Sequence, residues 1–208
     1  KVWDARTSPE LTTLKGRGDH AESVAVSADG SRIVTGWEDD TAKVWDARSL
    51  AEVVTLEGHG RTVTSVAVSP DGSRLVTGSY GKFGETAKVW DARTSAELAT
   101  LKGHGDPVTT LAVSPDGSRI VTGSMDKTAK VWNARTFAVL ATLKGHTGTV
   151  TTVAVSPDST RILTSSMDNT VKVWDARTFA VLATLKGHSN YVTSVAVSPD
   201  GSRIVTGS

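Results

Sequence analysis

Residues 107–144 read PVTTLAVSPDGSRIVTGSMDKTAKVWNARTFAVLATLK, and this stretch decides the fold. It contains four short segments rich in Val, Ile, Thr and Leu: Val108 to Ser114, Ser118 to Ser124, Thr128 to Asn133 and Ala138 to Lys144. Pro115-Asp116-Gly117 separates the first two segments and is typical of a tight turn, because Pro presets φ and Gly accepts a positive φ. The stretch therefore predicts four antiparallel strands.

The same unit recurs along the whole chain of 208 residues. Each copy of Lys-Val-Trp ends in a tryptophan, and these are Trp3, Trp45, Trp90, Trp132 and Trp174, separated by 42, 45, 42 and 42 residues. One four-stranded sheet cannot bury both of its faces, so the units must stack face to face. Radial stacking leaves only short, protected strand edges, which favours a closed ring of sheets.

Composition excludes several classes of protein. Lys and Arg total 23 against 22 Asp and Glu, so the net charge of +1 argues against binding to nucleic acid or to a membrane surface. The absence of cysteine excludes disulfides, thiol nucleophiles and Cys-ligated metals. The sequence contains no run of about 18 or more apolar residues, so it predicts no membrane-spanning helix. We expect no nucleic-acid or membrane partner and favour a cytoplasmic location.

The motifs of each unit resemble those of the WD-repeat β-propeller family. Gly-His precedes the first strand at His59, His104, His146 and His188, and Trp-Asp closes the third strand in four units, with Asn133 replacing Asp in the other. The resemblance implies an all-β propeller of four-stranded antiparallel blades. The chain supplies five blade equivalents as one domain: residues 17–57, 58–102, 103–144, 145–186, and 187–208 completed by 1–16.

The ends of the sequence fall inside a unit. Lys1 stands in a third strand and Ser208 ends a second strand, so the two ends could together complete one shared blade. The family similarly fastens its rings by mixing both ends of the chain. We expect this closing blade to form either within one five-bladed ring or between two chains in a larger ring, which would make the protein a homo-oligomer through its open blade edges.

Repeated polar residues are expected to be structural rather than catalytic, because a catalytic group is needed only once. The resemblance implies a buried hydrogen-bonded set in each blade, namely His104, Ser124, Asp126 and Trp132, with the equivalents His146, Ser166, Asp168 and Trp174. A Ser/His/Asp combination could also indicate a hydrolase triad, but its repetition favours the structural interpretation. No catalytic residue, metal site or cofactor is predicted.

Positions that vary between units are the candidates for binding. In this family the turns between strands two and three share one face of the disc, the top, with the loops before strand one. The first full unit has Trp37 where Ser is expected, and the second has a turn lengthened by three residues. Aromatic residues and Met are enriched at interfaces. The candidate partner-binding residues are His20, Trp37, Glu38, Tyr80, Lys82, Phe83, Met125, Met167 and Tyr191.

The sequence therefore predicts a noncatalytic scaffold that binds other proteins or peptides on the top face. Two alternatives remain open. Residues 136–146 and 178–188 are identical, which favours a structural module whose near-identical blades assemble into a ring from more than one chain. An enzyme or small-ligand site in the central channel would need a unique polar cluster, whereas the first strands look interchangeable.

Overall fold

Every element of the chain is a β-strand in our computed structural model, which describes residues 1–16, 18, 20–81 and 85–208. Four sheets have four antiparallel strands each, ordered as in the sequence. The first two sheets comprise β3 (Ala21–Val26), β4 (Arg32–Trp37), β5 (Ala42–Asp46) and β6 (Glu52–Leu56), then β7 (Val63–Val68), β8 (Arg74–Ser79), β9 (Glu85–Asp91) and β10 (Glu97–Lys102). The next two comprise β11 (Val108–Val113), β12 (Arg119–Ser124), β13 (Ala129–Asn133) and β14 (Val139–Leu143), then β15 (Val150–Val155), β16 (Arg161–Ser166), β17 (Val171–Asp175) and β18 (Val181–Leu185).

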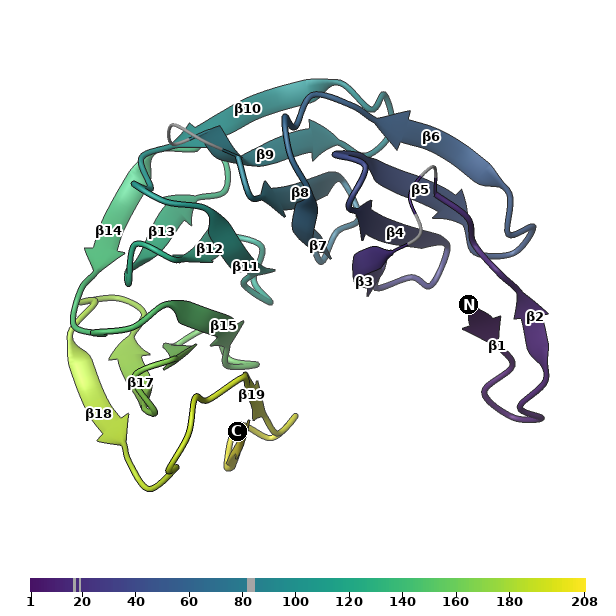
Figure 1. The fold of residues 1–208 in the computed structure, drawn as a ribbon. Coiled ribbons are helices and arrows are strands. Elements are labelled where there is room, and N and C mark those ends of the chain that lie inside the picture. The colour runs from purple at the N-terminus through teal and green to yellow at the C-terminus, as the bar shows by residue number, and fades with distance from the viewer. Residues whose placement is uncertain (17, 19, 82–84) are drawn as a thin grey trace.

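The sheets follow one another around an arc, with first strands inside and fourth strands outside (Figure 1). Successive first strands contact each other across the inner side of the arc. This arrangement confirms the predicted all-β fold of propeller blades. We call the four complete sheets blades 1 to 4, in chain order.

The first hairpin of each blade is fixed by its Asp-centred turn. In blade 3, Ser114 Oγ donates to Asp116 Oδ1 at 2.5 Å, and the same oxygen accepts the Ser118 amide at 2.9 Å. Gly117 has φ of 69°, a conformation that costs glycine little. The turn thus joins strands one and two into a hairpin, at the position where the sequence predicts a turn.

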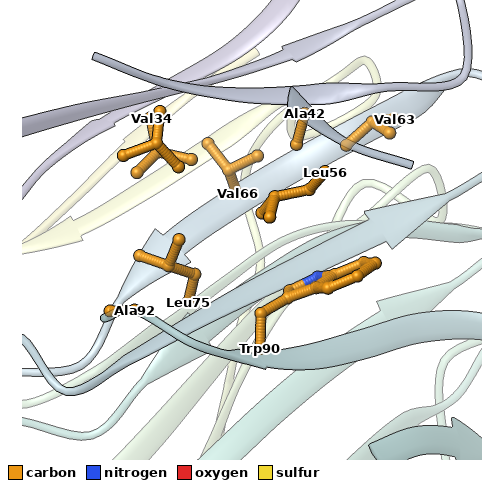
Figure 2. Packing of buried hydrophobic residues seen from close by; sticks show 9 residues of the cluster. Val34, Ala42, Leu56, Val63, Val66, Leu75, Trp90 and Ala92 are labelled. Atoms are coloured by element: carbon orange, nitrogen blue, oxygen red, sulfur yellow. The ribbon is translucent and has the colours of Figure 1, made fainter. Parts of the chain in front are cut away.

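The hydrophobic core lies between blades rather than within them (Figure 2). Trp90 of blade 2 packs with Val34, Ala42 and Leu56 of blade 1 in one cluster of buried side chains. The equivalent clusters at the next two junctions contain Trp132 and Trp174. Trp90, Trp132 and Trp174 therefore each join their blade to the preceding one, which explains why the tryptophan recurs in the repeat.

The ring does not close within the chain. Strands β1 (Val2–Trp3) and β2 (Glu10–Thr12) form one two-stranded sheet, and β19 (Ser194–Val197) and β20 (Ile204–Gly207) form another. The two half-sheets stand at opposite ends of the arc with a gap between them (Figure 1). The prediction of a shared closing blade within a single chain is therefore wrong for this structure, because packing between neighbouring blades sets an angle that five equivalents do not carry through a full circle.

Candidate partner-binding face

A hydrogen-bonded network locks each complete blade, and its centre is a threonine. In blade 3, Trp132 Nε1 donates to Thr122 Oγ1 at 2.9 Å, and His104 Nε2 lies 2.8 Å from the same oxygen. His104 Nδ1 lies 2.7 Å from Asp126 Oδ2. Because a carboxylate only accepts, Nδ1 carries the proton and Nε2 accepts the threonine hydroxyl. Thr122 is fully buried, so this network holds the loop before β11 against the blade.

The predicted serine has a different place in the network. Ser124 Oγ donates to the Asp106 carbonyl at 2.9 Å and accepts the Asp126 amide at 3.0 Å. It therefore supports the turn that carries Asp126 and does not contact His104. The sequence predicts Ser124 as a member of the same hydrogen-bonded set as His104 and Trp132, whereas the hydroxyl that meets both rings in the structure belongs to Thr122, two residues before it.

Blade 4 repeats the same arrangement. His146 Nδ1 lies 2.8 Å from Asp168 Oδ2. Thr164 Oγ1 accepts a hydrogen bond from Trp174 Nε1 at 2.9 Å and lies 2.7 Å from His146 Nε2. Ser166 Oγ donates to the Gly148 carbonyl at 3.0 Å. The recurrence shows that the set is a device of the repeat rather than a single reactive centre.

The electrostatics of the network follow from burial and hydrogen bonding. Burial tends to raise the pKa of Asp168, but hydrogen bonds from Thr170, the Thr147 amide and His146 lower this pKa to about 2. Burial lowers the pKa of His146 despite the neighbouring carboxylate. Both directions keep the carboxylate charged and disfavour protonation of the histidine.

Blade 2 lacks the aspartate of this network. His59 Nε2 lies 2.6 Å from Thr77 Oγ1, which also accepts Trp90 Nε1 at 2.9 Å. His59 Nδ1 is buried and has no hydrogen-bond partner among the described residues. Burial, with the positive charge of Lys88, lowers the pKa of His59 to about 4.

Blade 1 replaces the histidine with a second indole. Trp37 Nε1 donates to Thr35 Oγ1 at 2.7 Å, and Trp45 Nε1 donates to the same oxygen at 2.9 Å. Trp37 is only 5% exposed, and it packs in a cluster with Val2 and Leu14. The prediction that Trp37 lies on the binding surface is therefore wrong, because the indole fills the space in which the other blades hold histidine.

The remaining candidates sit where two loops of a blade meet. The residue after strand two donates its amide to the carbonyl of the residue before strand one, and these pairs are Glu38 with His20 at 3.3 Å, Tyr80 with Thr62 at 3.0 Å, Met125 with Pro107 at 3.0 Å and Met167 with Thr149 at 2.9 Å. We call the surface formed by these loops the top face. The two variable series of the sequence are thus neighbours in every complete blade.

Most of these side chains are accessible on the top face. Met125 is 37% exposed, Met167 42%, Tyr80 38% and Tyr191 53%, and His20 and Glu38 are also exposed. Lys82 and Phe83 lie outside the described residues. The accessible set therefore runs from blade 1 to the half-sheet β19–β20.

The described residues contain no group of three or more His, Asp or Glu side chains that could hold a metal ion. The buried hydroxyl of Thr122 is occupied by two ring nitrogens. In the described parts of the chain we also find no helix with the length and apolar character needed to cross a membrane.

Sequence reasoning missed the threonine at the centre of the network. Its signal was present, because Thr35, Thr77, Thr122, Thr164 and Thr206 recur at one position of strand two. Threonine is common in strands, so its recurrence alone did not separate a network residue from an ordinary strand residue.

A known family profile matches the same repeats that the sequence shows. The profile of the WD domain, G-beta repeat, matches residues 8–46, 51–91, 95–133, 137–175 and 179–208. Repeats of this kind generally mediate protein–protein interaction in scaffolds that are typically noncatalytic. No curated protein matches the chain. Because the profile covers most of the sequence in five successive copies, the chain belongs to the WD40 repeat family.

Proposed function

We propose that this chain is a noncatalytic scaffold that binds a partner protein or peptide across its top face. The observation that carries the proposal is a row of exposed side chains on the top face. Tyr80, Met125 and Met167 stand at equivalent positions of successive blades, and Tyr191 stands at the other variable position, before β19. Such side chains supply large contact areas at interfaces, and Met adapts to irregular partners.

The backbone beneath this row is held firmly. The amides of Met125 and Met167 are bonded to the loops before β11 and β15, and the His–Thr–Trp networks lie directly below. A preorganised surface loses little conformational entropy on binding, which favours affinity. The scaffold would therefore act through shape and exposed apolar side chains rather than through chemistry.

Affinity capture followed by quantitative mass spectrometry tests this proposal. The triple variant Met125→Ala, Met167→Ala and Tyr191→Ala should lose the proteins captured by the unmodified chain. Val53→Ala, on the outer strand of blade 1 and 56% exposed, is the matched control and should retain them. Retention of all partners by the triple variant, at unchanged melting temperature, would refute a top-face site.

A second candidate function is assembly of several chains through the half-sheets. It is favoured because each end of the chain holds only part of the blade network. His188 Nε2 lies 2.7 Å from Thr206 Oγ1, but no tryptophan of the described residues joins them. Trp3 is 55% exposed beside an apolar cavity of about 500 Å³ that Val24 and Val26 also line. We propose that β1 of one copy pairs with β20 of another, as β13 pairs with β12.

In complete blades Ile120 stands opposite Trp132, so Ile204 should stand opposite Trp3 of the second copy. Multi-angle light scattering of the 208-residue chain measures the outcome. We expect a mass that rises with concentration and falls to that of a monomer for Trp3→Ala. A monomer at all concentrations would eliminate this second candidate and leave the top-face proposal untouched.

A further inference from the structure

In three repeats, a glutamate on the outer strand forms an ion pair with a lysine of the same sheet. Glu10, Glu52 and Glu97 each lie within reach of a lysine on strand three, at 2.6 Å from Lys1, 2.6 Å from Lys43 and 2.8 Å from Lys88. The second carboxylate oxygen accepts a threonine hydroxyl of the same strand, at 2.6 Å for Thr13, 2.6 Å for Thr55 and 2.5 Å for Thr100. The lysine and the threonine thus form a clamp with two donors.

Blades 3 and 4 keep both donors but lack the carboxylate. Val139 stands opposite Trp132, and Val181 opposite Trp174, where Glu97 stands opposite Trp90 in blade 2. Lys130 Nζ still donates to Thr142 Oγ1 at 2.9 Å, and Lys172 Nζ to Thr184 Oγ1 at 3.1 Å. No carboxylate among the described residues pairs with Lys130 or Lys172.

The lysine stems occupy equivalent places in both kinds of blade. A Cβ built on Gly58 would lie 3.9 Å from Lys88 Cε and 4.0 Å from Glu97 Oε2. A Cβ built on Gly103 would likewise lie 3.7 Å from Lys130 Cε, and one built on Gly145 would lie 3.5 Å from Lys172 Cε. The donors of blades 3 and 4 are therefore positioned as they are where a carboxylate is bound.

The surface around these donors is apolar and lies on an open strand edge. Val139 and Leu140 are 46% and 44% exposed, and Val181 and Leu182 are 46% and 54% exposed. Strands β14 and β18 are the outermost strands of their sheets (Figure 1). Such an edge offers unpaired backbone groups to an added strand.

From this comparison of repeats we infer that the outer edges of blades 3 and 4 bind an extended, acidic segment of a partner protein. A Glu or Asp side chain of that segment would enter the Lys130–Thr142 or Lys172–Thr184 clamp, and its apolar neighbours would cover the exposed Val and Leu. Charge complementarity selects this occupant, because an ammonium group beside apolar surface gains most from a carboxylate. Two identical copies on adjacent blades provide two such sites per chain.

Peptide binding to the intact chain tests the inference. The probe is a fluorescein-labelled, end-blocked peptide of sequence Thr-Val-Glu-Val-Thr-Val, and its matched control carries Gln in place of Glu. Fluorescence anisotropy at low salt should show about tenfold tighter binding of the Glu peptide. Equal affinities for the two peptides would overturn the carboxylate clamp.

A pair of variants separates the clamp from misfolding. Val139→Glu with Val181→Glu supplies the carboxylate within the chain, as in Glu97, so the fold is kept while both sites are filled. We expect this double variant to bind the Glu peptide at least about tenfold more weakly. Undiminished binding to it would overturn the inference. The top-face variant Met125→Ala should bind the peptide as the unmodified chain does, which keeps this test distinct from that of the top face.

Discussion

Replacing Thr122 by valine tests the reasoning about the blade network most directly. Valine keeps the branched shape of threonine and replaces its hydroxyl by a methyl group. The hydroxyl is the shared partner of Trp132 Nε1 at 2.9 Å and His104 Nε2 at 2.8 Å. These side chains are 0%, 2% and 3% exposed for Thr122, Trp132 and His104, so water cannot replace the lost group without opening the blade.

The expected loss in the free energy of unfolding follows from two buried atoms, Trp132 Nε1 and His104 Nε2, that are left without a hydrogen-bond partner. Each such atom costs about 1–3 kcal/mol, which gives a loss of about 2–6 kcal/mol for Thr122→Val. Thr122→Ser keeps the hydroxyl and removes one methyl group, at a cost of about 1 kcal/mol. The network therefore predicts that the smaller serine is the better replacement, although valine preserves more of the packing.

Urea unfolding followed by far-UV circular dichroism measures these differences. Thr147→Val is the matched control, since Thr147 is exposed and, among the described residues, only its backbone amide and not its hydroxyl is hydrogen-bonded, so we expect a change within about 0.5 kcal/mol. Faster hydrogen exchange of the Trp132 indole proton in Thr122→Val would locate the effect. A valine variant as stable as the serine variant would refute the central role of this hydroxyl.

Three other changes test separate parts of the structure. The pKa of His59 is lowered from 6.5 to about 4, so the neutral histidine stabilises the fold above pH 6.5. Between pH 7 and pH 5 the free energy of unfolding should fall by about 2 kcal/mol, because the unfolded chain is protonated first. Urea titrations at the two pH values should show a smaller fall for His59→Gln. Gly123→Ala would place Cβ 2.6 Å from Val150 Cγ1 of the next blade and should cost about 1–3 kcal/mol, measured by calorimetry. Val139→Glu should change the free energy of unfolding by at most about 1 kcal/mol in the stabilising direction, and high salt should remove this gain in thermal melts.

The strands and their order could be predicted from the sequence because each signal is local. The run Val108 to Ser114 and the turn at Asp116 need no distant partner to be interpreted, and both appear in the structure as expected. Trp132 could be assigned to the core because it recurs once per unit. Its neighbours could not, since they belong to the next sheet and depend on how the blades stack.

The network was predicted only in part for a related reason. His104 and Asp126 stand out because they lie in the loops next to the strands, where the same residue types recur in the next unit as His146 and Asp168. Thr122 and Ser124 lie two residues apart on one strand, and only the register with β13 shows which hydroxyl meets Trp132. Trp37 was predicted to lie on the binding surface because aromatic residues are enriched at interfaces, whereas its indole takes the place of a missing histidine at the end of β4.

The departures from the repeat can be interpreted only by comparing blades within the structure. From sequence alone, the change from Glu97 to Val139 is an unremarkable difference between two units. In the structure, Glu97 fills a clamp of Lys88 and Thr100, while the donors near Val139 remain in place without it. In a repeat protein, one blade can therefore serve as the reference for another. Blade 2 binds the Glu97 carboxylate within the chain, and its contacts define the geometry that blade 3 leaves for a partner.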